Sequence, residues 1–241
     1  MMIWHEHRRH QHNIKLRGRM TTETIASGRI VFCDFDGTIT ARESLELVFK
    51  TFAPGRWEPV RDKLMAGQLT VREGVRQIME TIPSARYSEI CEFVAAIPIR
   101  RGLEAFLDFL DERNIPFVVI SGGFRGMVEA RLGTLTERLH RIFAADLDTS
   151  GPLLKVVSDY ESDAELVAKA EVMALFPQVQ KIAIGDGITD LNMAAHADMV
   201  FARDMLARFL DQSGIAYQPW TDFFDLRDRL NTLISYPSAN I

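Results

Sequence analysis

Four short apolar runs alternate with longer segments of helical periodicity from Ile30 onwards. Each run closes on a polar or glycine-rich turn, and the four are IVFCDF at 30–35, FVVISGG at 117–123, KIAIGDG at 181–187 and DMVFARD at 198–204. Near-continuous apolar runs are typical of strands buried on both faces of a parallel sheet. Their alternation with helices predicts an α/β fold with a doubly wound, Rossmann-like parallel sheet. The residues that close the runs should then meet at one edge, where such sheets bind ligands.

The first two runs are too far apart for a single crossover helix. A strand–helix–strand unit takes about 30 residues, whereas more than eighty separate Phe35 from Phe117. The surplus has helical periodicity at 43–52, 57–66, 70–80 and 87–95, and a return helix is expected at 101–113. Thr70 followed by Glu73 has the spacing of a capping box. We therefore expect a small helical cap at 42–98, inserted over the strand ends.

The predicted organisation is a catalytic core in two pieces around that cap. The core would comprise residues 27–41 and 99–236, and residues 1–26 would form a disordered tail. Residues 1–19 carry a net charge of +4 and the remainder −9, within a total of −5. An acidic body disfavours nucleic acid as a partner, because phosphate backbones need a basic face.

Composition places the chain among ordinary globular proteins. It has 241 residues, 47% hydrophobic and 25% charged, which excludes collagen-like, fibrous and disordered classes. Two cysteines form no disulfide framework or zinc cluster and are typical of a reducing compartment. The sequence contains no apolar stretch near the roughly 18 residues of a membrane helix. We expect a cytoplasmic protein with no membrane partner, and the sequence leaves its oligomeric state open.

The turn DFDGTIT carries two acidic residues, Asp34 and Asp36, at the end of the first run. Side chains two apart at a strand end face the same side, so the two carboxylates repel unless a cation or a shared proton relieves them. The third run closes on GDGITD, which supplies Asp186 and Asp190. Asp34 and Asp186 on neighbouring strands could hold one Mg²⁺, which prefers oxygen ligands.

A carboxylate beside a metal ion can attack phosphorus if the charge of the phosphate is neutralised. Ser121 closes the second run just before a helix, and its hydroxyl with the Gly122 and Gly123 amides would suit phosphate oxygens. Helix N-termini and backbone amides are common phosphate sites. The second run is therefore predicted to supply phosphate-binding groups.

A lysine is also needed to neutralise the charge of the phosphate, and three lysines are candidates. Lys169 precedes the GDGITD run on a helical segment. Lys181 begins a strand at the wrong end of the sheet, and Lys155 lies on an expected hairpin in TSGPLLKV. We favour Lys169, while Lys155 and Lys181 stay open as alternatives.

These residues fit one reaction. Asp34 would attack phosphorus in line and form an aspartyl-phosphate, while Asp36 protonates the leaving oxygen and then deprotonates the hydrolytic water. Mg²⁺, Lys169 and Ser121 would stabilise the transferring group. Asp190 would not bind the phosphate itself but would orient Lys169 or a metal-bound water.

The ordered set DFDGTIT, SGG, a lysine and GDGITD resembles the four motifs of the haloacid dehalogenase superfamily of phosphatases. The resemblance implies Asp34 as nucleophile, Asp36 as acid and base, and Ser121 and Lys169 as phosphate binders. It also implies Mg²⁺ held by Asp34, Asp186 and the backbone carbonyl of Asp36. The insert is similar to the helical cap of phosphoserine phosphatases.

A narrower resemblance, from about Ile30 to Leu230, is to the methionine-salvage phosphatases of that superfamily. It is carried by KTFAPGRWE, LTVREGVRQIMETIP, PFVVISGG and FARDMLARFLDQSGIAYQPWTDFFDLRDRL. It implies a small phosphate ester with a methylthio tail as substrate. Glu43 occupies the position of a glutamate that contacts the amine in phosphoserine phosphatases, whereas their carboxylate-binding arginine falls on Ile78, with Arg76 close by. An apolar Ile78 fits the methylthio tail better than an amino acid.

Two alternatives remain at this point. One is phosphoserine phosphatase or another small-metabolite phosphatase of the same superfamily. The other belongs to a different class, a receiver-like signalling module phosphorylated on aspartate. That module has no second aspartate in a DxD arrangement and no room for a cap of this size.

Overall fold

The computed structural model describes residues 25–235, so nearly all of the tail predicted at 1–26 lies outside the described residues. The described part holds a seven-stranded sheet with the order β4-β3-β2-β1-β5-β6-β7. The strands are β1 (Arg29–Cys33), β2 (Phe117–Phe124), β3 (Arg141–Asp148), β4 (Lys155–Val157), β5 (Gln180–Gly185), β6 (Met199–Ala202) and β7 (Gln218–Pro219). All neighbours pair in parallel except β3 and β4. The predicted doubly wound α/β fold is confirmed.

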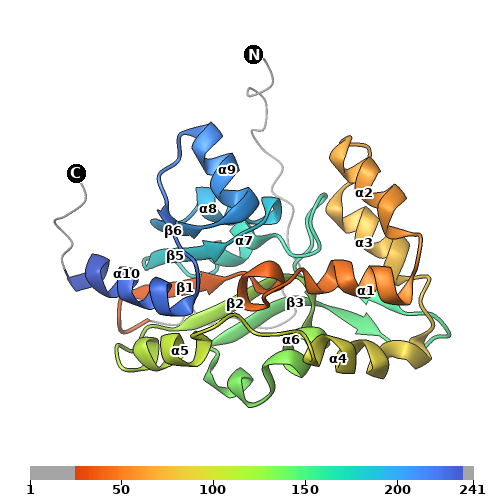
Figure 1. Ribbon diagram of the computed structural model, residues 1–241, viewed down its shortest axis with the longest axis horizontal. Helices are drawn as coiled ribbons and strands as arrows, with labels where there is room; N and C mark the ends of the chain where they lie inside the picture. The colour runs from red at the N-terminus through yellow and green to blue at the C-terminus, as the bar shows by residue number, and fades with distance from the viewer. Residues whose placement is uncertain (1–24, 236–241) are drawn as a thin grey trace.

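Helices cover both faces of this sheet (Figure 1). The core helices are α5 (Leu103–Asp111), α6 (Arg125–Leu132), α7 (Lys169–Ala174), α8 (Leu191–Ala195), α9 (Asp204–Ser213) and α10 (Phe223–Ser235). Period-two alternation in β1 divides its side chains, because Val31 and Cys33 pack with α5 and α10 while Ile30 and Phe32 pack with α7 and α8. This two-sided burial explains why the strands read as continuous apolar runs.

The strand predictions differ from the structure at their ends. The closing polar residues of the first and third runs lie beyond the last ladder pair, so β1 stops at Cys33 and β5 at Gly185. The first of these turns is a short irregular helix at Phe35–Ile39, and the other short helices lie at Ser84–Arg86, Gly133–Arg138 and Ile188–Asp190. The expected hairpin around Lys155 is present as the antiparallel β3–β4 pair.

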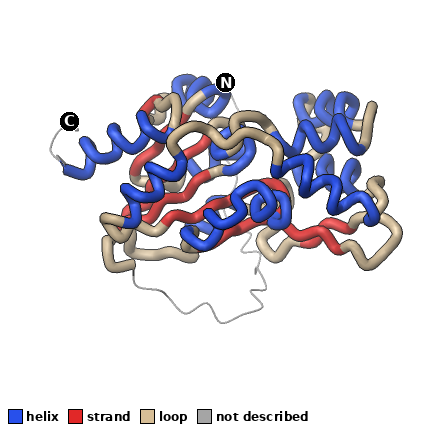
Figure 2. The backbone as a smooth tube through the Cα atoms, turned by 60° about the horizontal axis from the view of Figure 1, so that its bottom comes forward, coloured by secondary structure: helices blue, strands red, loops and turns tan. Residues whose placement is uncertain are grey.

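The insert between β1 and β2 is helical, as the periodicity predicts. Its helices are α1 (Ser44–Phe52), α2 (Trp57–Met65), α3 (Val71–Met79) and α4 (Tyr87–Ala95). The capping box at α3 is confirmed, because Thr70 Oγ1 accepts the Glu73 N–H at 3.2 Å and Glu73 Oε2 accepts the Thr70 N–H at 2.8 Å. Figure 2 shows these helices gathered at one end of the sheet. Whether residues 42–98 form a separate domain stays a prediction.

The cap does not stand apart from the sheet. Its apolar side chains share one buried cluster with core residues from α6 and the β3–β4 hairpin, including Met127, Leu154 and Val156. The Leu154 N–H donates to Ile82 O at 2.9 Å. This bond joins the hairpin to the segment of the cap between α3 and α4. The cap therefore packs against the core along α6 and the β3–β4 hairpin.

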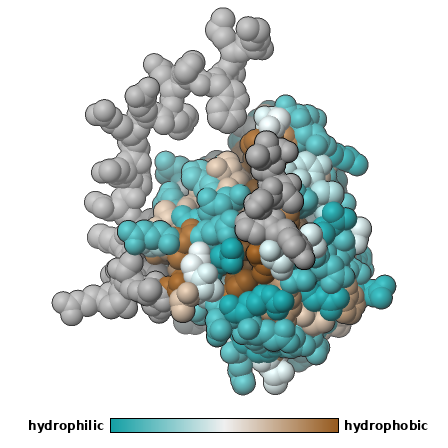
Figure 3. All heavy atoms as spheres, turned by 90° about the vertical axis from the view of Figure 1, so that its left-hand side faces the viewer, coloured by the Kyte–Doolittle hydropathy of each residue, from teal (hydrophilic) through white to brown (hydrophobic). Residues whose placement is uncertain are grey.

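The surface on the opposite side is mostly hydrophilic. Figure 3 views the side where α9 and α10 lie, and apolar side chains occur there only in small separate areas outside the grey atoms. Within residues 25–235, no helix has both the length and the apolar content to cross a membrane.

Candidate active site

The carboxyl ends of β1 and β5 bring Asp34 and Asp186 to the same edge of the sheet. Cys33 pairs with Ile184 in parallel register, and the Asp34 N–H donates to Ile184 O at 2.9 Å. Asp34 and Asp186 therefore leave neighbouring strands at almost the same level. Both side chains are buried, with 4% and 6% of their residue surfaces exposed.

Lys169 is the lysine that reaches this edge. It is the first residue of α7 and is buried, and its Nζ donates to Asp34 Oδ1 at 2.5 Å and to Asp190 Oδ1 at 2.6 Å. Burial alone would lower the pKa of Lys169, but the charges of Asp190 and Asp34 outweigh it and raise the pKa above the ordinary value. The ammonium therefore stays charged. Lys181 lies at the start of β5, at the opposite edge of the sheet, and Lys155 begins β4, where it pairs with Asp148 on β3.

Asp190 has both carboxylate oxygens engaged. Oδ1 accepts from Lys169, and Oδ2 accepts the N–H groups of Asp186 and Gly187, each at 3.0 Å. Gly185 leaves the room for this side chain, since an ideal Cβ there would lie 2.6 Å from Asp190 Cγ. Asp190 thus holds the Lys169 ammonium from behind and fixes the turn that carries Asp186.

The three carboxylates of Asp34, Asp186 and Asp190 form a cluster whose ligand oxygens lie within 4.8 Å of one another. Burial and then repulsion by Asp190 raise the pKa of Asp34, although Lys169 opposes them. Burial also raises the pKa of Asp186 to about 6, partly offset by a hydrogen bond from Thr38. One lysine does not balance this negative charge. An oxygen-only donor set with excess negative charge fits a hard divalent cation.

The turn after Asp34 is shaped by Gly37, whose φ is +81°. An ideal Cβ on Gly37 would collide with Asp186 Oδ2 and would lie 2.7 Å from Glu43 Oε1. The next residue, Thr38, is fully buried and donates its hydroxyl to Asp186 Oδ1. The turn therefore packs directly against a candidate metal ligand, and only glycine fits its first bend.

The Asp36 carboxylate is directed at the first turn of the cap helix α1. Its Oδ1 accepts the Ser44 hydroxyl and, at 3.3 Å, the Leu45 N–H, while its Oδ2 lies 3.3 Å from Ser121 Oγ. Burial raises the pKa of Asp36, and the hydrogen bond from Ser44 offsets part of the rise. A carboxyl group with a raised pKa suits a proton donor. The Asp36 carboxylate therefore lies outside the cluster formed by Asp34, Asp186 and Asp190.

Ser121 and its glycines occupy an irregular end of β2. The register against β3 shifts between Ile120 and Phe124. Ser121 Oγ accepts the Gly123 N–H at 2.9 Å, so that amide is engaged within the strand end. Gly122 has open space where a Cβ would lie. Of the predicted phosphate-binding groups, the Ser121 hydroxyl donates to Asp36 Oδ2 at 3.3 Å, and Gly122 has no side chain that would crowd a ligand.

Glu43 lies at the mouth of the site, immediately before α1. Glu43 is exposed, yet its carboxyl group packs against Gly37 in the turn that follows Asp34. Removal of water from that carboxyl, with repulsion by Asp36 and Asp186, raises the pKa of Glu43 to about 9. The side chain makes no capping bond to α1. Glu43 therefore borders the site instead of serving as a helix cap.

Two polar residues of the site were missed by the sequence reasoning. Thr38 lies two residues after Asp36 in the DGT sequence, and that position was the available signal. Ser44 is the first residue of α1, and a single serine at a helix start carries no signal that it contacts an aspartate eight residues earlier. Both are fully buried and both donate to an aspartate of the site.

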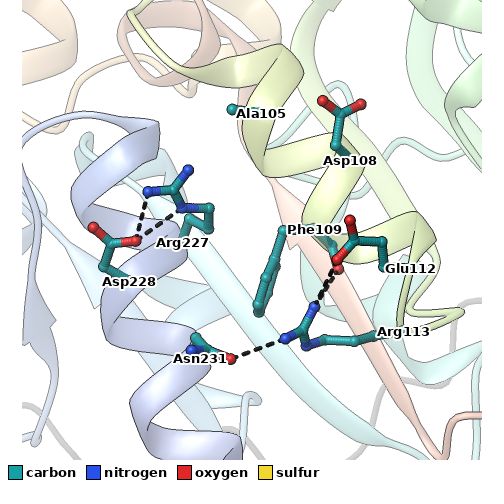
Figure 4. Close-up of a pocket in the computed structure, with 8 residues that line it drawn as sticks. All are labelled: Ala105, Asp108, Phe109, Glu112, Arg113, Arg227, Asp228 and Asn231. Carbon is teal, nitrogen blue, oxygen red and sulfur yellow. Dashed lines mark hydrogen bonds and ion pairs between the residues drawn. The ribbon is translucent and has the colours of Figure 1, made fainter.

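A separate pocket of about 290 Å³ lies between α5 and α10 (Figure 4). Arg113 donates to Asn231 Oδ1 at 3.0 Å there, and its guanidinium stacks 4.0 Å from the Phe109 ring. Lys169 and the four aspartates of the candidate site do not line this pocket. Its charged groups are in ion pairs, Arg113 with Glu112, Arg227 with Asp228, and Asp108 with Arg138 outside the lining.

This fold and site agree with the comparisons with known proteins. A family model described as haloacid dehalogenase-like hydrolase matches residues 31–195, more than half of the chain. The chain belongs to the haloacid dehalogenase-like hydrolases, and the superfamily resemblance of its motifs is confirmed.

Two similar proteins carry the same, more specific name. A 2-hydroxy-3-keto-5-methylthiopentenyl-1-phosphate phosphatase of Microcystis aeruginosa (strain NIES-843 / IAM M-2473) is 47% identical over 204 residues, covering 84% of this chain and 97% of the relative. A protein with the same name in Geobacillus thermodenitrificans (strain NG80-2) is 34% identical over 212 residues, covering 85% and 96%. The narrower resemblance is therefore also supported along nearly the full length of those proteins.

Solved structures share the fold. A phospho-aspartyl intermediate analogue of phosphoserine phosphatase superposes with a TM-score of 0.63 at 20% identity, covering 85% of this chain and 98% of that one. A substrate-bound phosphoserine phosphatase complex gives 0.64 at 19%, covering 86% and 97%. At this identity the likeness establishes a common architecture and nothing about the substrate.

Proposed function

We propose that this chain is a Mg²⁺-dependent phosphomonoester hydrolase that works through an aspartyl-phosphate. Its substrate is 2-hydroxy-3-keto-5-methylthiopentenyl 1-phosphate, which it converts to phosphate and the acireductone of methionine salvage. The observation that carries the chemistry is the buried contact of Lys169 with Asp34 at the carboxyl ends of the strands. The substrate rests on the relatives named above, which match over nearly their whole length.

The nucleophile is Asp34. Its carboxylate attacks phosphorus opposite the leaving oxygen, a P–O bond to Asp34 forms, and the bond to the leaving oxygen breaks. Asp36 gives its proton to that oxygen. Water then attacks the phosphorus of the aspartyl-phosphate, Asp36 takes the proton of the water, and Asp34 is released with inorganic phosphate.

The remaining residues hold the phosphate and the ion. Lys169, the Ser121 hydroxyl and the backbone at Gly122 bind phosphate oxygens, with Lys169 kept charged by its two aspartates. The carboxylates of Asp34 and Asp186 and the carbonyl of Asp36 would hold Mg²⁺, which would supply positive charge next to the transferring group. Asp190, with both oxygens engaged, orients Lys169 and the Asp186 turn and stays outside the ligand set.

An amino-acid substrate is disfavoured by the cap. Ile78, where phosphoserine phosphatases would carry a carboxylate-binding arginine, is fully buried. Arg76 donates to Glu161 Oε2 and to Val156 O, both at 2.6 Å, so its guanidinium is committed to the contact between cap and hairpin. Neither residue offers a free cation to a substrate carboxylate, which favours the methylthio ester over phosphoserine.

The proposal includes the organisation of the chain. Residues 42–98 act as a cap over a core made of 27–41 and 99–236, and the partner of the site is a small phosphate ester in the cytoplasm. A receiver-like module is disfavoured because Asp36 accompanies Asp34 and a four-helix insert covers the strand ends.

A phosphate-release screen tests the proposal. The purified chain is assayed with Mg²⁺ and with a chelator on the enol-phosphate, phosphoserine and an aryl phosphate. We expect Mg²⁺-dependent release, highest kcat/KM for the enol-phosphate and little turnover of phosphoserine. Preference for phosphoserine would contradict the substrate, and release that a chelator leaves unchanged would contradict the metal role.

A further inference from the structure

The two segments that join the cap to the core are paired with each other. Thr40, on the way out of the core, forms an antiparallel bridge with Ile99, on the way back. The Arg100 N–H donates to Ile39 O at 2.8 Å and extends this pairing by one bond. Arg100 is thus part of the short ladder through which the chain re-enters the core.

The side chain of Arg100 turns back to the catalytic turn. Its Nε donates to Thr38 O at 2.9 Å and its Nη2 donates to Gly37 O. A guanidinium presents donors in a rigid planar fork, and bonds from a charged donor are stronger than neutral ones. One side chain therefore fixes two consecutive carbonyls of the turn.

Both residues lie against the side-chain carboxylate of Asp186. Gly37 makes the bend that needs a left-handed conformation, and an ideal Cβ on it would collide with the Asp186 carboxylate. Thr38 donates its hydroxyl to Asp186 Oδ1. Arg100 donates to the backbone carbonyls of both residues, while Thr38 also donates to a candidate metal ligand through its hydroxyl.

The guanidinium of Arg100 is itself confined. Its Cζ lies 5.4 Å from the Trp220 ring centroid, and the Cζ of Arg203 lies 5.2 Å from the same ring. Trp220 is buried, with 3% of its surface exposed. Arg203 is anchored in turn, since it donates to Thr221 O at 2.7 Å. The aromatic ring and the second arginine restrict where the Arg100 side chain can lie.

We propose that Arg100 is a positioning residue for the catalytic turn: through the Gly37 and Thr38 carbonyls it sets the place of the Thr38 hydroxyl, and thereby of Asp186. The role in turnover rests on the proposed function. The role of Arg100 in placing Asp186 does not rest on the proposed function, because Mg²⁺ binding by the protein without substrate measures it. A residue that orients a metal ligand from behind is typically worth 10–100-fold in metal affinity or activity.

Arg100→Met tests this, because methionine keeps an unbranched apolar chain and removes every donor. The matched control is Arg101→Met, which removes the same charge from the exposed neighbouring residue. Mg²⁺ binding is measured by calorimetry on the purified proteins without substrate, and kcat and KM are measured separately. We expect Arg100→Met to weaken Mg²⁺ binding and lower kcat by about 10–100-fold with a smaller change in KM. Arg101→Met should resemble the unaltered protein.

Two further variants separate positioning from mere support of the fold. Arg100→Lys keeps the charge but lacks the fork, so it should recover part of the loss. In a Thr38→Val background, Arg100→Met should weaken Mg²⁺ binding by less than it does alone, because the hydroxyl through which it acts is gone.

The outcomes distinguish the two proposals. If Arg100→Met lowers only the unfolding midpoint and leaves Mg²⁺ binding like the Arg101→Met control, Arg100 is structural and the inference is wrong. Additive losses with Thr38→Val would also overturn it. If the unaltered protein binds Mg²⁺ but hydrolyses none of the phosphate esters, the proposed function fails, while the binding data still decide the role of Arg100.

Discussion

The ammonium of Lys169 lies 2.5 Å from Asp34 Oδ1, although 135 residues separate them in the sequence. The contact is possible because α7 starts at the edge of the sheet where β1 ends, and Asp190 holds the same ammonium from its other side at 2.6 Å. A buried charge pair of this kind contributes little net stability when intact. The pair instead fixes the positions of a carboxylate and an ammonium at the place where a phosphoryl group would bind.

Replacement of Lys169 by methionine should therefore harm both stability and turnover. Asp34 and Asp190 would be left as buried carboxylates without a counter-charge, which costs about 3–5 kcal/mol of unfolding free energy. Loss of a donor to the transferring group should lower kcat by roughly 100-fold or more. Urea unfolding and phosphate release measure the two effects.

Lys155→Met and Lys181→Met are the matched controls for that experiment. Neither residue reaches the aspartates, so both variants should keep kcat within about 2-fold of the unaltered protein, as for surface substitutions away from a site. A large loss in either control, with Lys169→Met active, would transfer the phosphate-binding role to the other lysine.

The sequence predicted the strands best where they are buried on both faces. Continuous apolar runs exist because β1, β2 and β5 lie in the middle of the sheet, and their closing polar residues follow from the parallel topology. β7 was not predicted, and β3 was expected only as one arm of the hairpin around TSGPLLKV. β3 ends in Asp146, Leu147 and Asp148, and β7 has two residues, so neither forms a continuous apolar run.

The candidate site was predictable where a motif lies at a strand end, and less so elsewhere. Asp34, Asp36 and Asp186 follow directly from their runs, but the choice of Lys169 over Lys155 needed tertiary proximity. Arg100 had no signal, because its role depends on the pairing of Thr40 with Ile99 across the whole insert. Local periodicity carries no information about such contacts.

Gly37→Ala should damage the site beyond the strain of its backbone. An alanine at φ +81° costs about 1–2 kcal/mol, and its Cβ would also displace Asp186 and Glu43. Gly67 is the matched control, with φ +66° and open space around its Cα. We expect a similar backbone cost in both variants and weaker Mg²⁺ binding in Gly37→Ala alone, measured by thermal unfolding and calorimetry. Equal Mg²⁺ binding in the two would contradict the contact with Asp186.

The Mg²⁺ dependence of stability should vary with pH. The folded state raises the pKa of Asp186 from 3.8 to about 6, so in the absence of metal this group favours folding at low pH. That contribution is lost as the pH rises through about 6. Mg²⁺ must displace the same proton, so its affinity should increase over this range and level off above it.

Thermal unfolding with Mg²⁺ or with a chelator, between about pH 5 and about pH 8, measures this dependence. The rise in Tm on adding Mg²⁺ should be small at the acid end and reach a plateau near neutrality. Asp186→Asn should show little rise at any pH. A Mg²⁺ effect that is independent of pH, or one that persists in Asp186→Asn, would exclude Asp186 from the ion site.

The account requires that Asp34 become phosphorylated during each turnover, and chemical trapping measures this directly. The enzyme is mixed with the enol-phosphate and Mg²⁺, quenched rapidly and reduced with borohydride, which converts an aspartyl-phosphate to homoserine. Peptide mass spectrometry should then find homoserine at position 34, and Asp34→Asn should be folded, inactive and free of it. Homoserine at position 36, or full turnover by Asp34→Asn, would contradict the account.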